Sequence, residues 1–186
     1  RSTGEVFVCT DATAGANVWK NVGEHSGDVT PAPGMRGSRG FSMGGHSKSS
    51  MDYFSIATIG NATSFGNQGA VYNGADGCTT NVTRGIYGVS TAANTIEYLT
   101  CATTGNATDF GDRTISKGGA VTGCGNGTRG IQAGADNGSN DATIDYVTIA
   151  STGNSTDFGD LTIARGDAGG GENDTRAVFM AGSGAL

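Results

Sequence analysis

The chain is built from an internal repeat, which restricts its fold more than any other feature, because each unit must bury its apolar face against a neighbour. One segment occurs three times with a tyrosine at its third position, in the ranges 51–67, 96–112 and 144–160. The tyrosines are 45 and 48 residues apart. An arginine that opens an apolar stretch precedes each copy and recurs once more, giving Arg39, Arg84, Arg129 and Arg176. The chain therefore contains three units and the beginning of a fourth.

Short β-strands are predicted within each unit. Apolar and polar residues alternate around each tyrosine, which is the period of a strand. A Gly-Asn corner follows, as at Gly105-Asn106, and a phenylalanine lies twelve residues after each tyrosine. A glycine-rich loop then leads to the next arginine. Three or four strands per unit of about 46 residues match a propeller blade, which has about 40 to 50 residues.

We therefore predict an all-β fold of blade-like, propeller-like repeats, with a β-trefoil or a prism of pseudo-threefold symmetry as the alternative. Residues 1–33 are predicted to form an N-terminal β-hairpin and a linker, because two short apolar runs flank a Gly- and Ala-containing loop there. Residues 34–186 form the predicted repeat domain. Its units are expected at about 34–81, 82–127 and 128–174, with a partial unit at 175–186.

Composition excludes several other classes of protein. Only three leucines among 186 residues exclude a helical bundle, and 34 glycines require many tight turns. A net charge of -6 with 11 basic residues argues against nucleic acid as a partner. No apolar stretch approaches the roughly 18 residues of a membrane span.

Each unit also pairs an arginine with an acid at the start of consecutive strands. We expect these pairs to be structural salt bridges: Arg39 with Asp52, Arg84 with Glu97, and Arg129 with Asp145. Arg176 has no acid after it, so its partner would come from elsewhere, such as Asp52 or another subunit.

Catalytic groups do not converge in the sequence. His25 and His46 lack a nearby nucleophile or metal ligand, so we expect no enzyme activity, no cofactor and no metal site. Cys78 and Cys124 lie in nearly equivalent segments and are expected to be free, or paired with Cys9 or another chain.

Recognition is expected in the segments that vary most between units, because variable loops on a fixed scaffold carry binding. These segments are 73–80, 121–128 and 166–174. The predicted contacts with a glycan or receptor are Tyr72, Tyr87, Asp76, Asn126 and Glu172.

The repeat strings Ile-Asp-Tyr-Val-Thr-Ile-Ala, Thr-Gly-Asn-Ala-Thr-Asp-Phe-Gly-Asp and Thr-Arg-Gly-Ile resemble the Kelch-like repeats of tail-fibre and other virion proteins of marine and cyanobacterial phages. The strings Gly-Glu-Val-Phe-Val-Cys-Thr-Asp and Asn-Val-Trp-Lys-Asn-Val-Gly resemble short hairpins of phage tail fibres.

This resemblance implies a non-enzymatic virion structural protein, part of a tail fibre or similar appendage that acts in assembly and host attachment. Its implied partners are other copies of itself, other virion proteins and a host-surface glycan. Two alternatives remain open: a subunit of a self-assembling extracellular filament, and a glycan-binding or depolymerase module.

Overall fold

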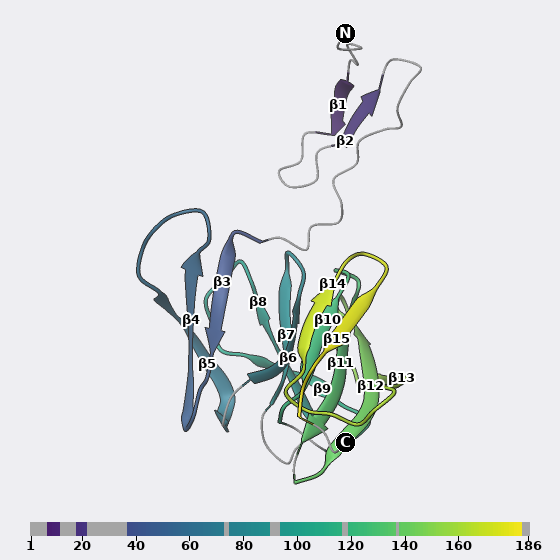
Figure 1. Cartoon of the computed structure of the whole chain (residues 1–186). Coiled ribbons are helices and arrows are strands. Elements are labelled where there is room, and N and C mark those ends of the chain that lie inside the picture. The colour runs from purple at the N-terminus through teal and green to yellow at the C-terminus, as the bar shows by residue number, and fades with distance from the viewer. Residues whose placement is uncertain are drawn as a thin grey trace. The chain divides into compact units, whose positions relative to one another are not determined.

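The computed structural model describes residues 7–11, 18–21, 37–72, 75–89, 94–116, 119–136 and 138–183. The chain divides into two compact parts, 1–35 and 36–186. All regular structure in the described ranges is β, which confirms the predicted class (Figure 1). In those ranges no helix is long and apolar enough to cross a membrane.

The N-terminal part contains one antiparallel hairpin, in which β1 (Phe7–Asp11) pairs with β2 (Val18–Asn21). The predicted hairpin therefore forms. Its predicted linker lies outside the described residues.

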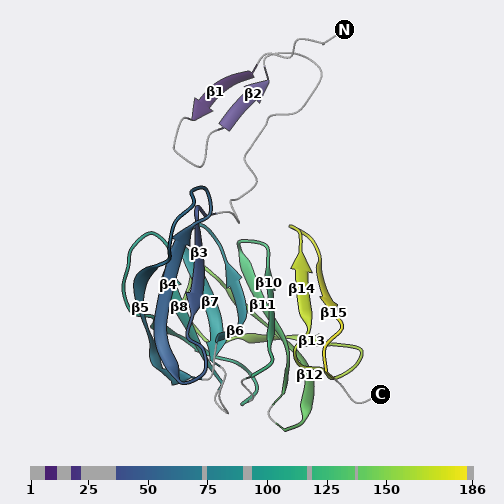
Figure 2. The same cartoon turned by 60° about the vertical axis from the view of Figure 1, so that its left-hand side comes forward.

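The second part contains four antiparallel sheets in chain order, which we call units one to four (Figures 1 and 2). Unit one comprises β3 (Arg39–Met43), β4 (Lys48–Ser55) and β5 (Thr63–Tyr72). Unit two comprises β6 (Ala75–Thr80), β7 (Arg84–Val89), β8 (Thr95–Thr100) and β9 (Thr108–Asp112). Unit three comprises β10 (Thr122–Gly125), β11 (Arg129–Asp136), β12 (Asn140–Thr148) and β13 (Thr156–Asp160). Unit four comprises β14 (Gly169–Glu172) and β15 (Ala177–Met180).

The unit boundaries differ from those expected from the repeat. The predicted cuts after residues 81, 127 and 174 fall inside sheets, because β6, β10 and β14 each pair with the arginine strand that follows them. A repeating sequence does not show at which residue one structural unit ends and the next begins. The hydrogen-bonded pairing of the strands sets these boundaries instead. Unit one consequently has no described strand equivalent to β6.

The segments predicted to be variable recognition loops are largely strands. The ranges 73–80, 121–128 and 166–174 contain β6, β10 and β14, and β10 contacts both of the others. Their glycines allow this contact. A Cβ on Gly123 would lie 2.3 Å from the carbonyl carbon of Gly77, and a Cβ on Gly170 would lie 2.8 Å from the sulfur of Cys124.

Adjacent units bury equivalent apolar residues at the surfaces between them, which we call junctions. Between units one and two, Met51 and Phe65 pack with Leu99 and Cys101. The cluster between units two and three consists of Ile86, Ile96, Phe110, Val147 and Ile149. In each case the following unit contributes one residue from its third strand, Leu99 or Val147, and one residue just after the end of that strand, Cys101 or Ile149. The core is therefore divided among junctions.

In units one to three, a glycine directly follows the repeated phenylalanine and has a positive φ. Gly66, Gly111 and Gly159 have φ values of 158°, 145° and 134°. A Cβ on Gly66 would lie 2.1 Å from the carbonyl oxygen of Gly105, and one on Gly111 would lie 2.4 Å from that of Gly153. A Cβ on Gly159 would meet no atom within 4 Å. Gly66 and Gly111 are thus enclosed by the backbone of the next unit, whereas Gly159, with a similar φ, has open space at its Cβ position.

This contrast predicts the effect of alanine on stability. Both Gly111→Ala and Gly159→Ala place a side chain at an unfavourable φ, which costs about 1–3 kcal/mol. Gly111→Ala additionally forces the Gly153 backbone away, so its loss of unfolding free energy should be larger by about 1–3 kcal/mol. Urea unfolding of both variants at low protein concentration, followed by circular dichroism, measures the difference. Equal losses would contradict the close approach.

Candidate functional site

The repeated arginines connect each unit to the next one. Nη1 of Arg39 donates to the carbonyl oxygens of Cys101 at 2.8 Å and Ala102 at 3.0 Å. Nη1 of Arg84 donates to the carbonyl oxygen of Ile149 at 3.0 Å. Each arginine therefore crosses its junction in the direction of the chain.

Within its own unit, each of these arginines stacks on the repeated tyrosine. The guanidinium carbons lie 4.6 to 4.8 Å from the ring centroids, in the pairs Arg39–Tyr53, Arg84–Tyr98 and Arg129–Tyr146. Each tyrosine in turn meets the phenylalanine of its unit edge to face, as Tyr98 meets Phe110 at 5.9 Å. The stacked ring holds the guanidinium at the junction and adds a cation–π attraction.

The Gly-Asn corner is a second connection across each junction. The backbone N–H of Gly105 donates to the carbonyl of Phe65 at 2.8 Å, and that of Gly153 donates to the carbonyl of Phe110 at 2.7 Å. Oδ1 of Asn106 accepts from the N–H of Asn67 at 3.1 Å. Asn154 accepts from Asp112 in the same way. These corners therefore attach the fourth strand of one unit to the next unit.

The acids face the opposite neighbour. Glu97 is buried, and its carboxylate accepts from the N–H of Gly69 in unit one at 3.1 and 3.2 Å. The hydroxyl of Tyr87 donates to the same carboxylate at 2.7 Å. Glu97 therefore links unit two backward to unit one.

Asp145 makes the equivalent backward link from unit three. It is fully buried, and Nε of Arg113 donates to its Oδ2 at 3.0 Å. The hydroxyl of Thr114 donates to its Oδ1. Burial lowers the pKa of the Arg113 guanidinium, and the Asp145 carboxylate acts in the opposite direction.

The predicted arginine–acid pairs are therefore not what the structure shows. Arg84 contacts unit three whereas Glu97 contacts unit one, and Arg113 rather than Arg129 pairs with Asp145. The Arg113–Asp145 ion pair joins unit two to unit three at 3.0 Å. Register explains the separation: Arg84 pairs across the sheet with Thr100, three positions from Glu97.

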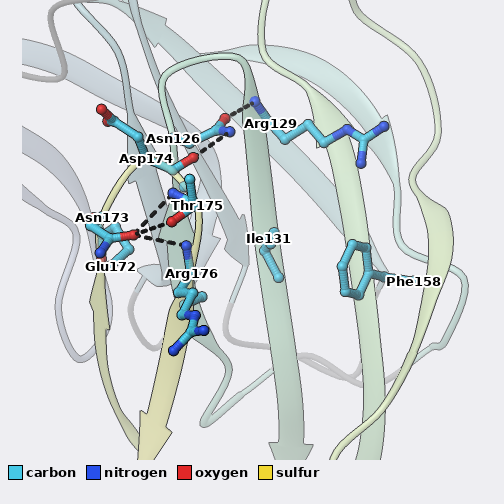
Figure 3. Close-up of a pocket in the computed structure, with 11 residues that line it drawn as sticks. Asn126, Arg129, Ile131, Phe158, Glu172, Asn173, Asp174, Thr175 and Arg176 are labelled. Atoms are coloured by element: carbon cyan, nitrogen blue, oxygen red, sulfur yellow. Dashed lines mark hydrogen bonds between the residues drawn. The ribbon is translucent and has the colours of Figure 1, made fainter. Parts of the chain in front are cut away.

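A pocket of about 150 Å³ lies at the junction between units three and four (Figure 3). Its floor is apolar, with Ile131 and Phe158 from unit three, and its polar lining includes Arg129, Glu172 and Arg176. A corresponding pocket between units one and two is lined by Arg39 and Phe41, the counterparts of Arg129 and Ile131. At this junction the described residues of unit four contribute the strands β14 and β15.

The structure places the predicted glycan contacts in different environments. Asn126 and Glu172 come together at the pocket, and Nδ2 of Asn126 donates to the Asp174 carbonyl at 3.3 Å. Tyr87 is fully buried, so it presents no surface on which a sugar could stack. Asp76 is half-buried in β6. Tyr72 ends β5, and its side chain lies outside what the structure describes.

Cys78, Cys101 and Cys124 are free thiols, so neither Cys78 nor Cys124 forms a disulfide with Cys9. Cys101 and Cys124 are buried, and Cys101 is part of a junction cluster. Burial, with a smaller effect of the nearby Glu172 carboxylate, raises the pKa of Cys124 to about 11. Its thiol therefore stays protonated at neutral pH.

Groups of three or more metal-ligating side chains do not occur in the described residues. No protein-family model matches the chain, and no curated protein matches it.

The forward arginine link can be tested by comparing two equivalent residues. Arg84→Met removes a charged hydrogen bond to unit three, which is worth about 1.5–3 kcal/mol. Arg129→Met removes only the stacking on Tyr146, because no described residue supplies the equivalent carbonyl. Urea unfolding should therefore show a larger loss of stability for Arg84→Met. A larger loss for Arg129→Met would contradict the forward link.

The backward link in unit three gives a separate prediction. Arg113→Met leaves the Asp145 carboxylate buried without its ionic partner and should lower the unfolding free energy by about 3–5 kcal/mol. The double variant with Asp145→Leu should lose less than the single variant, because it removes the uncompensated charge. The same denaturation assay measures both variants. A loss no larger than the ~1 kcal/mol of a surface pair would disprove this assignment.

Proposed function

We propose that the chain is a non-enzymatic structural module of a phage tail fibre or similar virion appendage, acting in assembly and host-surface attachment. The observation that carries this proposal is the use of the repeated polar side chains. The recurring arginines of units one and two bind the backbone of the following unit, and the recurring asparagines and acids of units two and three bind the preceding unit. Side chains of these types can act in catalysis in other proteins, but in this chain they hold β-sheets together.

The proposed arrangement of the units is blade-like, as in a propeller. Meander sheets in chain order and contacts among their first strands, β6, β10 and β14, support it. The resemblance of the repeat strings to Kelch-like virion repeats supports the same arrangement.

The proposed attachment to a host surface would be multivalent. Each copy would contribute a weak contact, and repetition along an appendage would raise the total affinity without any single strong site. The pocket at Asn126 and Glu172 is the candidate contact for a host-surface glycan, since it combines an apolar floor with amide, acidic and basic groups.

A self-assembling extracellular filament is the second candidate, favoured by the apolar side chains that the first and third units expose at their outer faces, such as Ile56 and Phe158. Particle morphology separates the two functions, because a filament subunit would form continuous fibres without virions.

Immunoelectron microscopy tests the proposal directly. Virions are prepared from a lysate of a phage that encodes the chain. Gold-labelled antibodies against the chain should label the appendages of these virions. The purified chain should compete with those virions for adsorption to host cells, whereas heat-denatured chain should not. Label on virion-free fibres would support the filament, and unlabelled virions would disprove the proposal.

Release of reducing sugar ends from host capsule by the same preparation would identify a depolymerase instead. This measurement is independent of the labelling, so each outcome assigns the chain to one class.

A further inference from the structure

Unit three presents the surface that units one and two use to bind the unit after them. We call this the tail surface, and it comprises Arg129, Ile131, Phe158, Gly159 and Thr162. Phe158 is 53% exposed, whereas its counterparts Phe65 and Phe110 are 3% and 2% exposed. Gly159 has the φ of its counterparts but no atom near its Cβ position.

Unit one presents the complementary surface, which units two and three use to bind the unit before them. We call this the head surface, and it comprises Asp52, Phe54, Ile56 and the corner 60–62. Ile56 is 66% exposed, whereas the residues in its place, Cys101 and Ile149, are 8% and 0% exposed. Phe54 is 42% exposed, and its counterparts Leu99 and Val147 are buried.

We propose that the head surface of one copy of this chain docks on the tail surface of a second copy. The argument rests on continuity with an interface already present twice within the chain: both surfaces are those that meet at the junctions between units one and two and between units two and three. The proposal names the partner for the assembly role above and rests on that role.

The repeat specifies the contacts of this intermolecular junction. Nη1 of Arg129 would donate to the carbonyl of Ile56, as Arg84 does to Ile149. The N–H of Gly60 would donate to the carbonyl of Phe158, as Gly153 does to Phe110. Asp52, exposed in the single chain, would accept from Thr162, the counterpart of Thr114.

One strand must move for the two surfaces to meet. β15 and the incoming β3 are both second strands of a unit, so they compete for pairing with β14. β15 is four residues long and leaves Val178 and Met180 exposed. β3 belongs to a sheet with no described first strand. Exchange of β15 for β3 would therefore give a complete four-stranded unit from β14 of one copy and β3, β4 and β5 of the other.

The contact joins two different surfaces, so its test uses complementary variants. Ile56→Asp blocks the head and Phe158→Asp blocks the tail. Sedimentation velocity should show concentration-dependent association of the wild-type chain and monomers for each variant alone. An equimolar mixture of the variants should form a one-to-one dimer, since each retains the surface that the other lacks.

Val82→Asp is the matched control, because it adds the same charge to an exposed side chain in the turn between β6 and β7, which belongs to neither the head surface nor the tail surface. It should associate as the wild type does. A monomeric wild-type chain, self-association of Ile56→Asp alone, or failure of the mixture to dimerise would overturn the proposal.

Gly159→Ala gives a more conservative test if an aspartate variant fails to fold. Its Cβ would collide with the Gly60 backbone of the second copy, so association should weaken at least tenfold. Gly138→Ala, with a φ of 84° and no atom near its Cβ position, controls for backbone strain and should associate normally. Equal association of the two alanine variants would overturn the proposed contact. Unlabelled virions would disprove the virion role without changing these results, so the two proposals can fail separately.

Discussion

The fold depends on how closely the backbones of neighbouring units approach one another. Side chains of ordinary size would keep packed sheets about 10 Å apart. Here Gly66 and Gly111 allow the carbonyls of Gly105 and Gly153 to reach the adjoining strand, and Gly123 allows β10 to contact β6. Hydrogen bonds between units then supplement an apolar core that is small in each unit. The high glycine content thus brings polar backbone groups within bonding distance across the junctions.

Much of the architecture follows from the repeat. The positions of Tyr98, Phe110 and the Gly-Asn corner predict strands and a reversal, and β8 and β9 occupy those positions. The strands β6, β10 and β14, each of which contains glycine, were not predictable from strand propensity, because their residues are selected for contact with another strand rather than for pairing. The spacing of Gly77 and Gly123 at the repeat period was the available signal.

The sequence was less informative about which residues bind each other. Periodicity shows that an arginine and an acid recur in each of units one to three, as Arg84 and Glu97 do in unit two, but it does not show whether each side chain faces the preceding or the following unit. The structure separates them, with the arginine directed forward and the acid backward. Tyr87 was predicted to contact a glycan or receptor. It is buried instead, and its hydroxyl donates to the Glu97 carboxylate.

The opposite directions of the arginine and the acid give the chain a polarity along its series of sheets. The arginine of unit two donates to the following unit and its acid accepts from the preceding one, so reversing one unit would set arginine against arginine and carboxylate against carboxylate. A head-to-tail assembly of such chains, as proposed above, would have two ends that differ chemically. Every copy in it would present its loops in the same orientation.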